Sequence, residues 1–243
     1  MIQIRRDWLP AVARAVIEES MPDHIRVTGS AGVATVTLAR PEKKNALSIA
    51  LRDEVSDAIG TLGRDENVKA VVITGEGNVF SAGFDLKEFR DLGDPEHARR
   101  LWASSDRFHH TILACPVPTI AAINGPALAG GFDLAVLCDL RIAASTASFA
   151  HPEIAFGDVV YGPLRELVGG AVARELALTG RAVGASEALA LRLLSAVVPP
   201  DELAAEVERW TAQILQAPRE LLVRTKQKIV RCSGAHPAAT LDL

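Results

Sequence analysis

The stretch that decides the fold is Ile120–Asp139, which reads IAAINGPALAGGFDLAVLCD. We expect a buried strand over Val117–Ile123, a turn at Asn-Gly-Pro, and an apolar helix that begins at Gly130 and Gly131. Two glycines at a helix start allow a ligand to approach the backbone closely. The first N–H groups of a helix lack partners, and the helix dipole there favours negative charge. The stretch therefore predicts a helix start that faces a ligand.

One turn into the same helix lies Asp133, an acid surrounded in sequence by Phe132, Leu134, Ala135 and Val136. A carboxylate in apolar sequence needs either a partner or a function. Enolate chemistry uses such a pair of groups: an N–H stabilises the oxyanion and an acid moves the proton. The stretch is therefore also a candidate catalytic centre.

Strand-like and helix-like segments alternate along the chain, which predicts an α/β fold. We expect three parts: an N-terminal helical extension over 1–22, a core over 23–199 and a short C-terminal helical region over 200–243. The expected strands are 24–28, 33–38, 68–74, 117–123 and 140–143. The expected helices are 7–20, 48–62, 87–114, 163–180, 185–194, 201–216 and 221–231.

Composition excludes several classes of protein. The 243 residues are 49% hydrophobic and carry a net charge of −4, so we expect no nucleic-acid partner. We find no secretory signal and no apolar run long enough to span a membrane. Cys115, Cys138 and Cys232 are widely spaced and odd in number, which is typical of reduced thiols in a cytoplasmic protein.

The glycine-rich segment Gly75–Gly83 resembles a dinucleotide-binding loop only superficially. Five residues separate its G-x-G from the next glycine, and no helix begins there. It is either a plain loop or, at Gly83-Phe84, the source of a second oxyanion donor that pairs with the N–H of Gly130.

Other candidates have ordinary structural explanations. Asp133 and Glu153 are either a catalytic pair or two acids at helix starts, and a His such as His151 is more often a packing or hydrogen-bonding residue than a base. The neighbours His109 and His110 have no third ligand in view, so we expect no metal site. A late basic cluster is either a solvated face or a phosphate contact; it comprises Arg224, Lys226, Lys228 and Arg231.

Five motifs fall in the order and spacing of one family, and they cover about residues 23–199. They are ARPEKKNAL at 39–47, VFSAGFDLK at 79–87, AINGPALAGG at 122–131, CDLR at 138–141 and FAHPEI at 149–154. With these motifs the chain resembles the crotonase (enoyl-CoA hydratase/isomerase) superfamily.

The resemblance implies a spiral of ββα turns with C-terminal helices, assembled as a homotrimer or hexamer. It also implies a coenzyme A thioester as substrate and no permanently bound cofactor. By resemblance, the N–H groups of Phe84 and Gly130 form an oxyanion hole, and Asp133 and Glu153 are the catalytic acids. The expected contacts to the substrate and to CoA are Lys43, Lys44, Asn45, Ala46, Leu47, Ala82, Asp85, Leu86 and Tyr161.

Three departures from the family pattern affect substrate and reaction. Asp133 stands at a position where the hydratases of the family carry Glu. An Asp/Glu pair is similar to that of the dienoyl-CoA isomerases. Those isomerases carry a further Asp after the second acid, and Tyr161 occupies its position here. The segment 157–165 replaces a Pro- and Gly-rich wall of the acyl pocket. The chain also stops soon after Arg231, where family members usually continue.

The expected function is therefore an enzyme of acyl-CoA chemistry, as in fatty-acid metabolism, that acts through a thioester enolate. The reaction is hydration of a 2-enoyl-CoA or isomerisation of its double bond. The alternatives are a non-catalytic acyl-CoA-binding or partner protein and a divergent decarboxylase or hydrolase of the same family.

Overall fold

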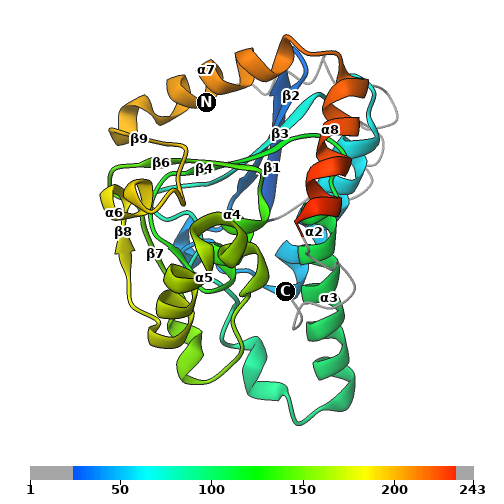
Figure 1. The fold of residues 1–243 in the computed structure, drawn as a ribbon. Helices are drawn as coiled ribbons and strands as arrows, with labels where there is room; N and C mark the ends of the chain where they lie inside the picture. The colour runs from blue at the N-terminus through cyan, green and yellow to red at the C-terminus, as the bar shows by residue number, and fades with distance from the viewer. Residues whose placement is uncertain (1–23, 234–243) are drawn as a thin grey trace.

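The structure is a computed structural model that describes residues 24–233, and its centre is a six-stranded sheet (Figure 1). The strand order is β1-β2-β3-β4-β6-β9; β1 pairs antiparallel with β2, and all other pairs are parallel. The strands are β1 Ile25–Ser30, β2 Val33–Leu38, β3 Ala70–Gly75, β4 Thr119–Ile123, β6 Leu140–Ala144 and β9 Ala196–Val198.

A second, three-stranded sheet lies beside the ends of the first one. It consists of β5 Ala127–Leu128, β7 Ser148–Ala150 and β8 Val183–Gly184, in the order β5-β7-β8. The chain passes from β4 to β5 and again from β6 to β7, so the loops between the two sheets lie close together in space. The predicted α/β class and the crotonase-type architecture are confirmed.

Alternating side chains of the large sheet belong to two separate hydrophobic clusters. Val71 and Ile73 of β3 lie in the main cluster, whereas Val72 packs with Leu203 and Val207 on the other side. This alternation follows from the two-residue period of a strand, and both faces are covered, as in other parallel sheets. Each fully buried aliphatic side chain contributes about 1.5–3 kcal/mol.

Seven α-helices surround the sheets in the described part of the chain. They are α2 Ile49–Arg64, α3 Pro95–Leu113, α4 Gly130–Leu137, α5 Gly162–Thr179, α6 Ala185–Ala190, α7 Leu203–Leu215 and α8 Arg219–Cys232. The predicted cap of α2 is present, because the Leu51 N–H donates to Ser48 Oγ at 3.3 Å. The short 3₁₀ helices are η1 Pro41–Lys43, η2 Glu88–Asp91, η3 Pro152–Ala155 and η4 Pro200–Glu202.

The helix expected over 87–114 is divided into η2 and α3. The side chain of Asp94 accepts from the Glu96 N–H at 2.9 Å, and Pro95 occupies the first turn of α3. An Asp cap followed by Pro is a strong start signal, so α3 begins there rather than at 87.

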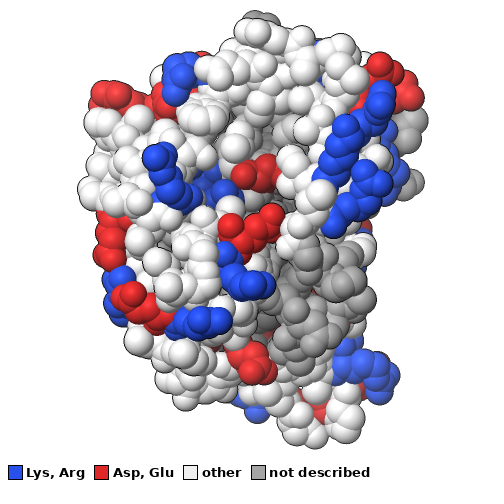
Figure 2. Space-filling view, in the orientation of Figure 1, with Lys and Arg blue, Asp and Glu red and all other residues white. Residues whose placement is uncertain are grey.

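The late basic cluster divides between the interior and the surface. Lys226 is buried and its ammonium pairs with the carboxylate of Asp139, which attaches α8 to the start of β6. Arg224, Lys228 and Arg231 are exposed, and Lys and Arg side chains gather over α8 in Figure 2.

Within residues 24–233, no helix combines the length and the hydrophobicity needed to cross a membrane. The predicted extension over 1–22 and the end of the C-terminal region, 234–243, lie outside the described residues. The division at residue 199 stays a prediction; α7 follows it and packs on the large sheet.

Candidate active site

The start of α4 lies against the loop that carries Phe84. A Cβ placed on Gly131 would lie 2.5 Å from the Ser81 carbonyl oxygen, and one placed on Gly130 would lie 2.6 Å from the Phe84 ring. The residue before the helix, Ala129, has φ 50° and ψ −130°, a strained conformation for a residue with a side chain. The two glycines therefore allow two segments of the chain to meet, and they orient the first N–H of α4.

Two neighbouring backbone N–H groups at this junction have no acceptor. Among residues 24–233, neither the N–H of Phe84 nor that of Gly130 donates a hydrogen bond. They are close together, since a Cβ on Gly83 would lie only 3.1 Å from the Gly130 nitrogen. The geometry is that of a two-donor site for an oxygen atom with developing negative charge.

The two segments predicted to contact CoA lie side by side. The Ala82 N–H donates to the Lys44 carbonyl at 3.0 Å, and the Leu47 N–H donates to the Gly83 carbonyl at 2.8 Å. Lys43, Lys44 and Leu86 are exposed, and Ala46, Ala82 and Asp85 are partly buried.

Asn45 and Leu47 are fully buried, and their backbone N–H and carbonyl groups already form hydrogen bonds within the protein. The Asn45 carboxamide oxygen accepts from the Arg40 N–H, and its nitrogen donates to the carbonyls of Glu76 and Val79. These bonds hold the loop in place; the side chain of Asn45 is structural.

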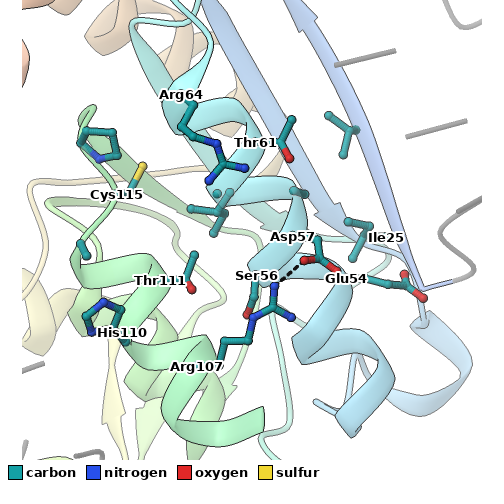
Figure 3. Close-up of a pocket in the computed structure, with 16 residues that line it drawn as sticks. Ile25, Glu54, Ser56, Asp57, Thr61, Arg64, Arg107, His110, Thr111 and Cys115 are labelled. Atoms are coloured by element: carbon teal, nitrogen blue, oxygen red, sulfur yellow. Dashed lines mark hydrogen bonds and ion pairs between the residues drawn. The ribbon is translucent and has the colours of Figure 1, made fainter. Parts of the chain in front are cut away.

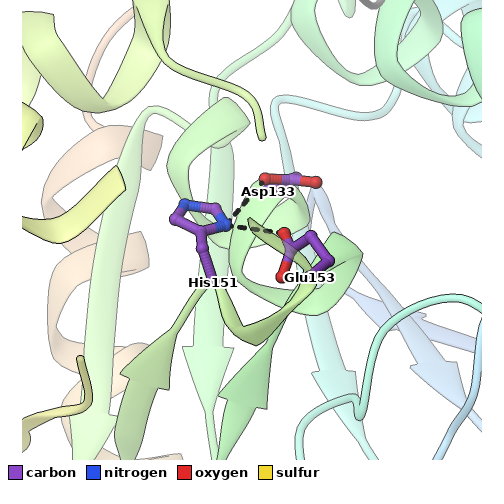
Figure 4. A group of neighbouring side chains, drawn as sticks. All are labelled: Asp133, His151 and Glu153. Atoms are coloured by element: carbon purple, nitrogen blue, oxygen red, sulfur yellow. Dashed lines mark hydrogen bonds and ion pairs between the residues drawn. The ribbon is translucent and has the colours of Figure 1, made fainter. Parts of the chain in front are cut away.

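Three titratable side chains meet beyond the start of α4 (Figure 4). Asp133 comes from α4, His151 follows β7, and Glu153 lies in η3. His151 Nδ1 is 2.9 Å from Glu153 Oε1, within hydrogen-bond distance, and 3.7 Å from Asp133 Oδ1. The two predicted acids are thus brought together, and an imidazole lies between them.

The imidazole of His151 is rigidly held. Its ring stacks on Phe132 with centroids 4.6 Å apart, and Phe132 in turn contacts Phe149. Burial by itself lowers the pKa of His151, but the hydrogen bond that its ring donates to Glu153 and the charges of Asp133 and Glu153 outweigh burial, and the pKa is raised. The sequence indicated a packing or hydrogen-bonding role for His151, and in the structure it has both, since it stacks on Phe132 and bonds to Glu153.

Burial raises the pKa of Asp133 to about 7; the charge of His151 opposes this rise and that of Glu153 adds to it. Its Oδ1 atom is buried and has no hydrogen-bond partner among the described residues, and the same is true of Glu153 Oε2. A carboxyl group with a pKa near neutrality exchanges protons readily under physiological conditions.

The same three residues offer one ligand atom each within 4.8 Å of one another. An imidazole with two carboxylates is a donor set that divalent cations accept. The hydrogen bond between His151 and Glu153 already accounts for the closeness of these two side chains. That the protein works without a metal stays a prediction.

Two further buried residues lie at the site: Arg52, which was not singled out from the sequence, and His109, which was considered there only as a metal ligand. Arg52 is fully buried in α2, lies 4.3 Å from the centroid of the Phe84 ring and donates to the carbonyls of Leu47 and Leu101. Burial lowers the pKa of Arg52 to about 10, so it remains charged at neutral pH. His109 is buried in α3, beside Phe84; the helical spacing of the apolar residues Leu101, Phe108 and Ile112 already indicates the buried face of α3.

Tyr161 lies just before α5 and packs, partly buried, against the main hydrophobic cluster. The preceding acid, Asp158, is exposed. The described structure therefore brings no third carboxylate to the Asp133–Glu153 pair from this segment.

A separate groove of about 470 Å³ lies between α2 and α3 (Figure 3). Its lining includes Glu54, Asp57, Arg64 and Arg107, and it contains none of the predicted site residues. Asp57 and Arg107 form an ion pair across it. The groove is a surface feature distinct from the candidate active site.

Asp133→Asn is expected to stabilise the folded protein at pH 8 by about 1–3 kcal/mol, because the amide has no charge to desolvate. The folded-state pKa of Asp133, about 7, lies above its ordinary value of 3.8, so the folded chain binds more protons than the unfolded chain between these values. Stability is therefore lost as the pH rises through this window, and the full cost is present above it.

Thermal unfolding at pH 8 and pH 5 measures this effect. The gain in Tm from Asp133→Asn should be clear at pH 8 and smaller at pH 5. The exposed residue Asp201 gives the control, since Asp201→Asn should leave the Tm unchanged at both pH values. An equal gain at both pH values would contradict the account of Asp133.

Fold and site together define a protein of the crotonase type. A sequence model of the enoyl-CoA hydratase/isomerase family matches residues 28–241, and the chain belongs to this family. It is thus an acyl-CoA-processing enzyme of the crotonase superfamily.

Individual relatives agree with this assignment. The chain is 38% identical to a probable enoyl-CoA hydratase of Mycobacterium tuberculosis, over 82% of this chain and 78% of that protein. It is 34% identical to 4-chlorobenzoyl coenzyme A dehalogenase-2 of an Arthrobacter species, over 85% of this chain and 77% of that protein. The crystal structure of an enoyl-CoA hydratase/isomerase from Xanthobacter autotrophicus superposes with a TM-score of 0.81 at 36% identity, covering 86% of this chain and 79% of the other.

Proposed function

We propose that the protein hydrates 2-enoyl-CoA thioesters through an enolate held in an oxyanion hole. The observation that carries the proposal is the pair of N–H groups at Phe84 and Gly130. They have no acceptor among residues 24–233 and lie next to the buried Asp133 and the partly buried Glu153. The thioester oxygen accepts from both N–H groups. Removal of one such donor typically costs about 10²–10³ in rate.

Glu153 is the proton donor to the α-carbon in this mechanism, and His151 holds it in position through the 2.9 Å bond. Asp133 acts at the β-carbon, where it takes a proton from water. Its pKa of about 7 leaves it ionised above neutral pH, as a base must be.

Double-bond isomerisation is the second candidate, and one observation favours it. Asp133 is one methylene shorter than the glutamate of the hydratases, and His151 already occupies one oxygen of Glu153. An isomerase needs one well-placed base to move a proton from one carbon to another, and Glu153 satisfies that requirement.

CoA binds, in this proposal, along the paired segments 43–47 and 82–86. The exposed Lys43 and Lys44 lie there and would meet phosphates as surface charges, so affinity should fall with added salt. Free acids lack the nucleotide and should bind much more weakly than their CoA thioesters.

The protein is further proposed to be a cytoplasmic homotrimer or hexamer. Exposed apolar side chains at Ile154, Phe156 and Leu178 support an interface between subunits. The free thiols of Cys115 and Cys138 suit a reducing compartment. Light scattering that gives the mass of one chain would contradict the assembly.

The test of the proposed function is hydration of crotonyl-CoA by the purified protein, followed by loss of the enoyl absorbance. Free crotonate serves as the control substrate. We expect turnover of the thioester and none of the free acid. A protein that binds crotonyl-CoA but hydrates neither it nor longer 2-enoyl-CoAs would contradict the proposal.

A further inference from the structure

His109 is a buried imidazole with no hydrogen bond of good geometry to another described residue. It is 1% exposed, and neither ring nitrogen has a partner within hydrogen-bond distance among the described residues. A buried polar group without a partner costs about 1–3 kcal/mol. The proposed oxyanion hole and the two acids give His109 no role, so the presence of a polar ring here requires an explanation.

The surroundings of His109 place it between the two halves of the site. Its ring stacks on that of Phe84, with centroids 6.2 Å apart and planes inclined by 30°, and packs edge-on against Phe108. On the other side, its Nε2 lies 4.0 Å from Asp133 Oδ2. It thus contacts an oxyanion residue and faces a catalytic acid.

The imidazole is neutral under ordinary conditions. Burial lowers the pKa of His109 to about 4, the backbone carbonyl of Ser105 opposes this shift, and the buried charge of Arg52 adds to it. A neutral imidazole carries its hydrogen on one ring nitrogen and accepts at the other. The tautomer with the hydrogen on Nδ1 presents an acceptor lone pair at Nε2 toward Asp133.

The separation from Asp133 suits one bridging atom. At 4.0 Å the two groups are too far apart for a direct hydrogen bond. If a water oxygen lies about 2.8 Å from both His109 Nε2 and Asp133 Oδ2, the angle at that oxygen between the two acceptors is about 90°. This angle is close to the angle between the O–H bonds of water, so a water there can donate one hydrogen to Asp133 and the other to His109.

We propose that His109 Nε2 and Asp133 Oδ2 together hold the water that adds to the β-carbon of the substrate. The inference rests on the proposed function and deepens it. In the proposed mechanism Glu153 delivers the proton to the α-carbon, and its Oε1 bonds to His151, so the second acceptor for the water comes from α3 rather than from Glu153. The water then points its lone pair at the carbon chain.

The water oxygen forms a bond to the β-carbon, and the π electrons of the double bond move through the α-carbon to the thioester oxygen. Asp133 takes one proton from the water, and the α-carbon receives one from the protonated Glu153. Exchange with solvent restores both acids, and one molecule of water has been added.

The test compares His109→Phe, which keeps the ring and its stacking, with His109→Gln, whose amide oxygen can still accept. Each is assayed for crotonyl-CoA hydration and for exchange of the α-hydrogens of butyryl-CoA in D₂O, a reaction that needs the oxyanion hole and Glu153 but no added water. Circular dichroism checks the fold. His110→Gln, at an exposed neighbouring position, is the control.

We expect His109→Phe to lower kcat for hydration by about 10–100-fold while KM and the exchange rate change less than about 2-fold. His109→Gln should recover most of the loss. Equal loss of exchange and hydration in His109→Phe would assign a structural role and overturn the inference, as would full hydration by this variant. A parent protein that exchanges the α-hydrogens but does not hydrate would overturn hydration as the proposed function and this inference with it.

Discussion

Glu153→Gln is expected to lower turnover of crotonyl-CoA by about 10³–10⁴-fold while leaving the affinity for the CoA thioester nearly unchanged. The amide has almost the shape of the carboxyl group but cannot deliver a proton to the α-carbon. The hydrogen bond to His151 can still form through the amide, so the cluster keeps its geometry. Initial rates with the thioester and calorimetric titration with a non-reacting acyl-CoA separate the two effects.

Glu208 provides the matched control for this substitution. It is exposed on α7, which packs on the opposite side of the large sheet from the main cluster, so Glu208→Gln should be fully active. Full activity of Glu153→Gln would contradict the mechanism and would direct attention to His151 as the base.

Gly130→Ala is expected to lower kcat by about 10²–10³-fold. The added Cβ would lie 2.6 Å from Cδ1 and Cε1 of the Phe84 ring, well inside van der Waals contact. The ring must move, and since Phe84 supplies the other N–H, both donors lose their alignment. Steady-state kinetics should show the loss mainly in kcat, because the oxyanion forms only along the reaction.

Gly93→Ala is the control, since a Cβ there would meet nothing within 4 Å. It should match the parent in both kcat and stability. A Gly130→Ala variant that folds and keeps its full kcat would show that the N–H groups of Phe84 and Gly130 do not stabilise the transition state.

Much of the fold was predictable because local signals agree with the tertiary structure. The apolar run before Thr74 and the one before Asn124 each form a buried parallel strand, and Ser48 caps the helix that follows it. The predicted helix over 87–114 was wrong in one detail, because the Asp94-Pro95 start signal within it was overlooked.

Only those residues of the site that lie within the sequence motifs could be predicted. The motifs gave Phe84, Gly130, Asp133 and Glu153, and the structure brings them together in two adjacent groups. The other contacts in the site depend on distances between residues that are far apart in the sequence, and spacing in the sequence does not determine those distances. The gap of 4.0 Å between His109 and Asp133 spans 24 positions of sequence, and it depends on how α3 packs on α4.

The interpretation of glycine at the start of α4 also needed the structure. The sequence suggested that Gly130 and Gly131 make room for a ligand. In the fold, Gly131 makes room for the backbone of Ser81, and Gly130 for the ring of Phe84. The same residues serve the site indirectly, because this close packing is what places the two N–H groups side by side.

The central claim is that the chain forms an acyl-CoA enolate between the Phe84 and Gly130 N–H groups and Glu153. Exchange of the α-hydrogens of butyryl-CoA in D₂O, followed by proton NMR, tests it most directly, because exchange requires the enolate and no later step. We predict exchange with the parent protein, at least about 10²-fold slower exchange with Glu153→Gln, and none of free butyrate. Exchange by Glu153→Gln at the parental rate, or no exchange by a parent protein that binds butyryl-CoA, would contradict the account.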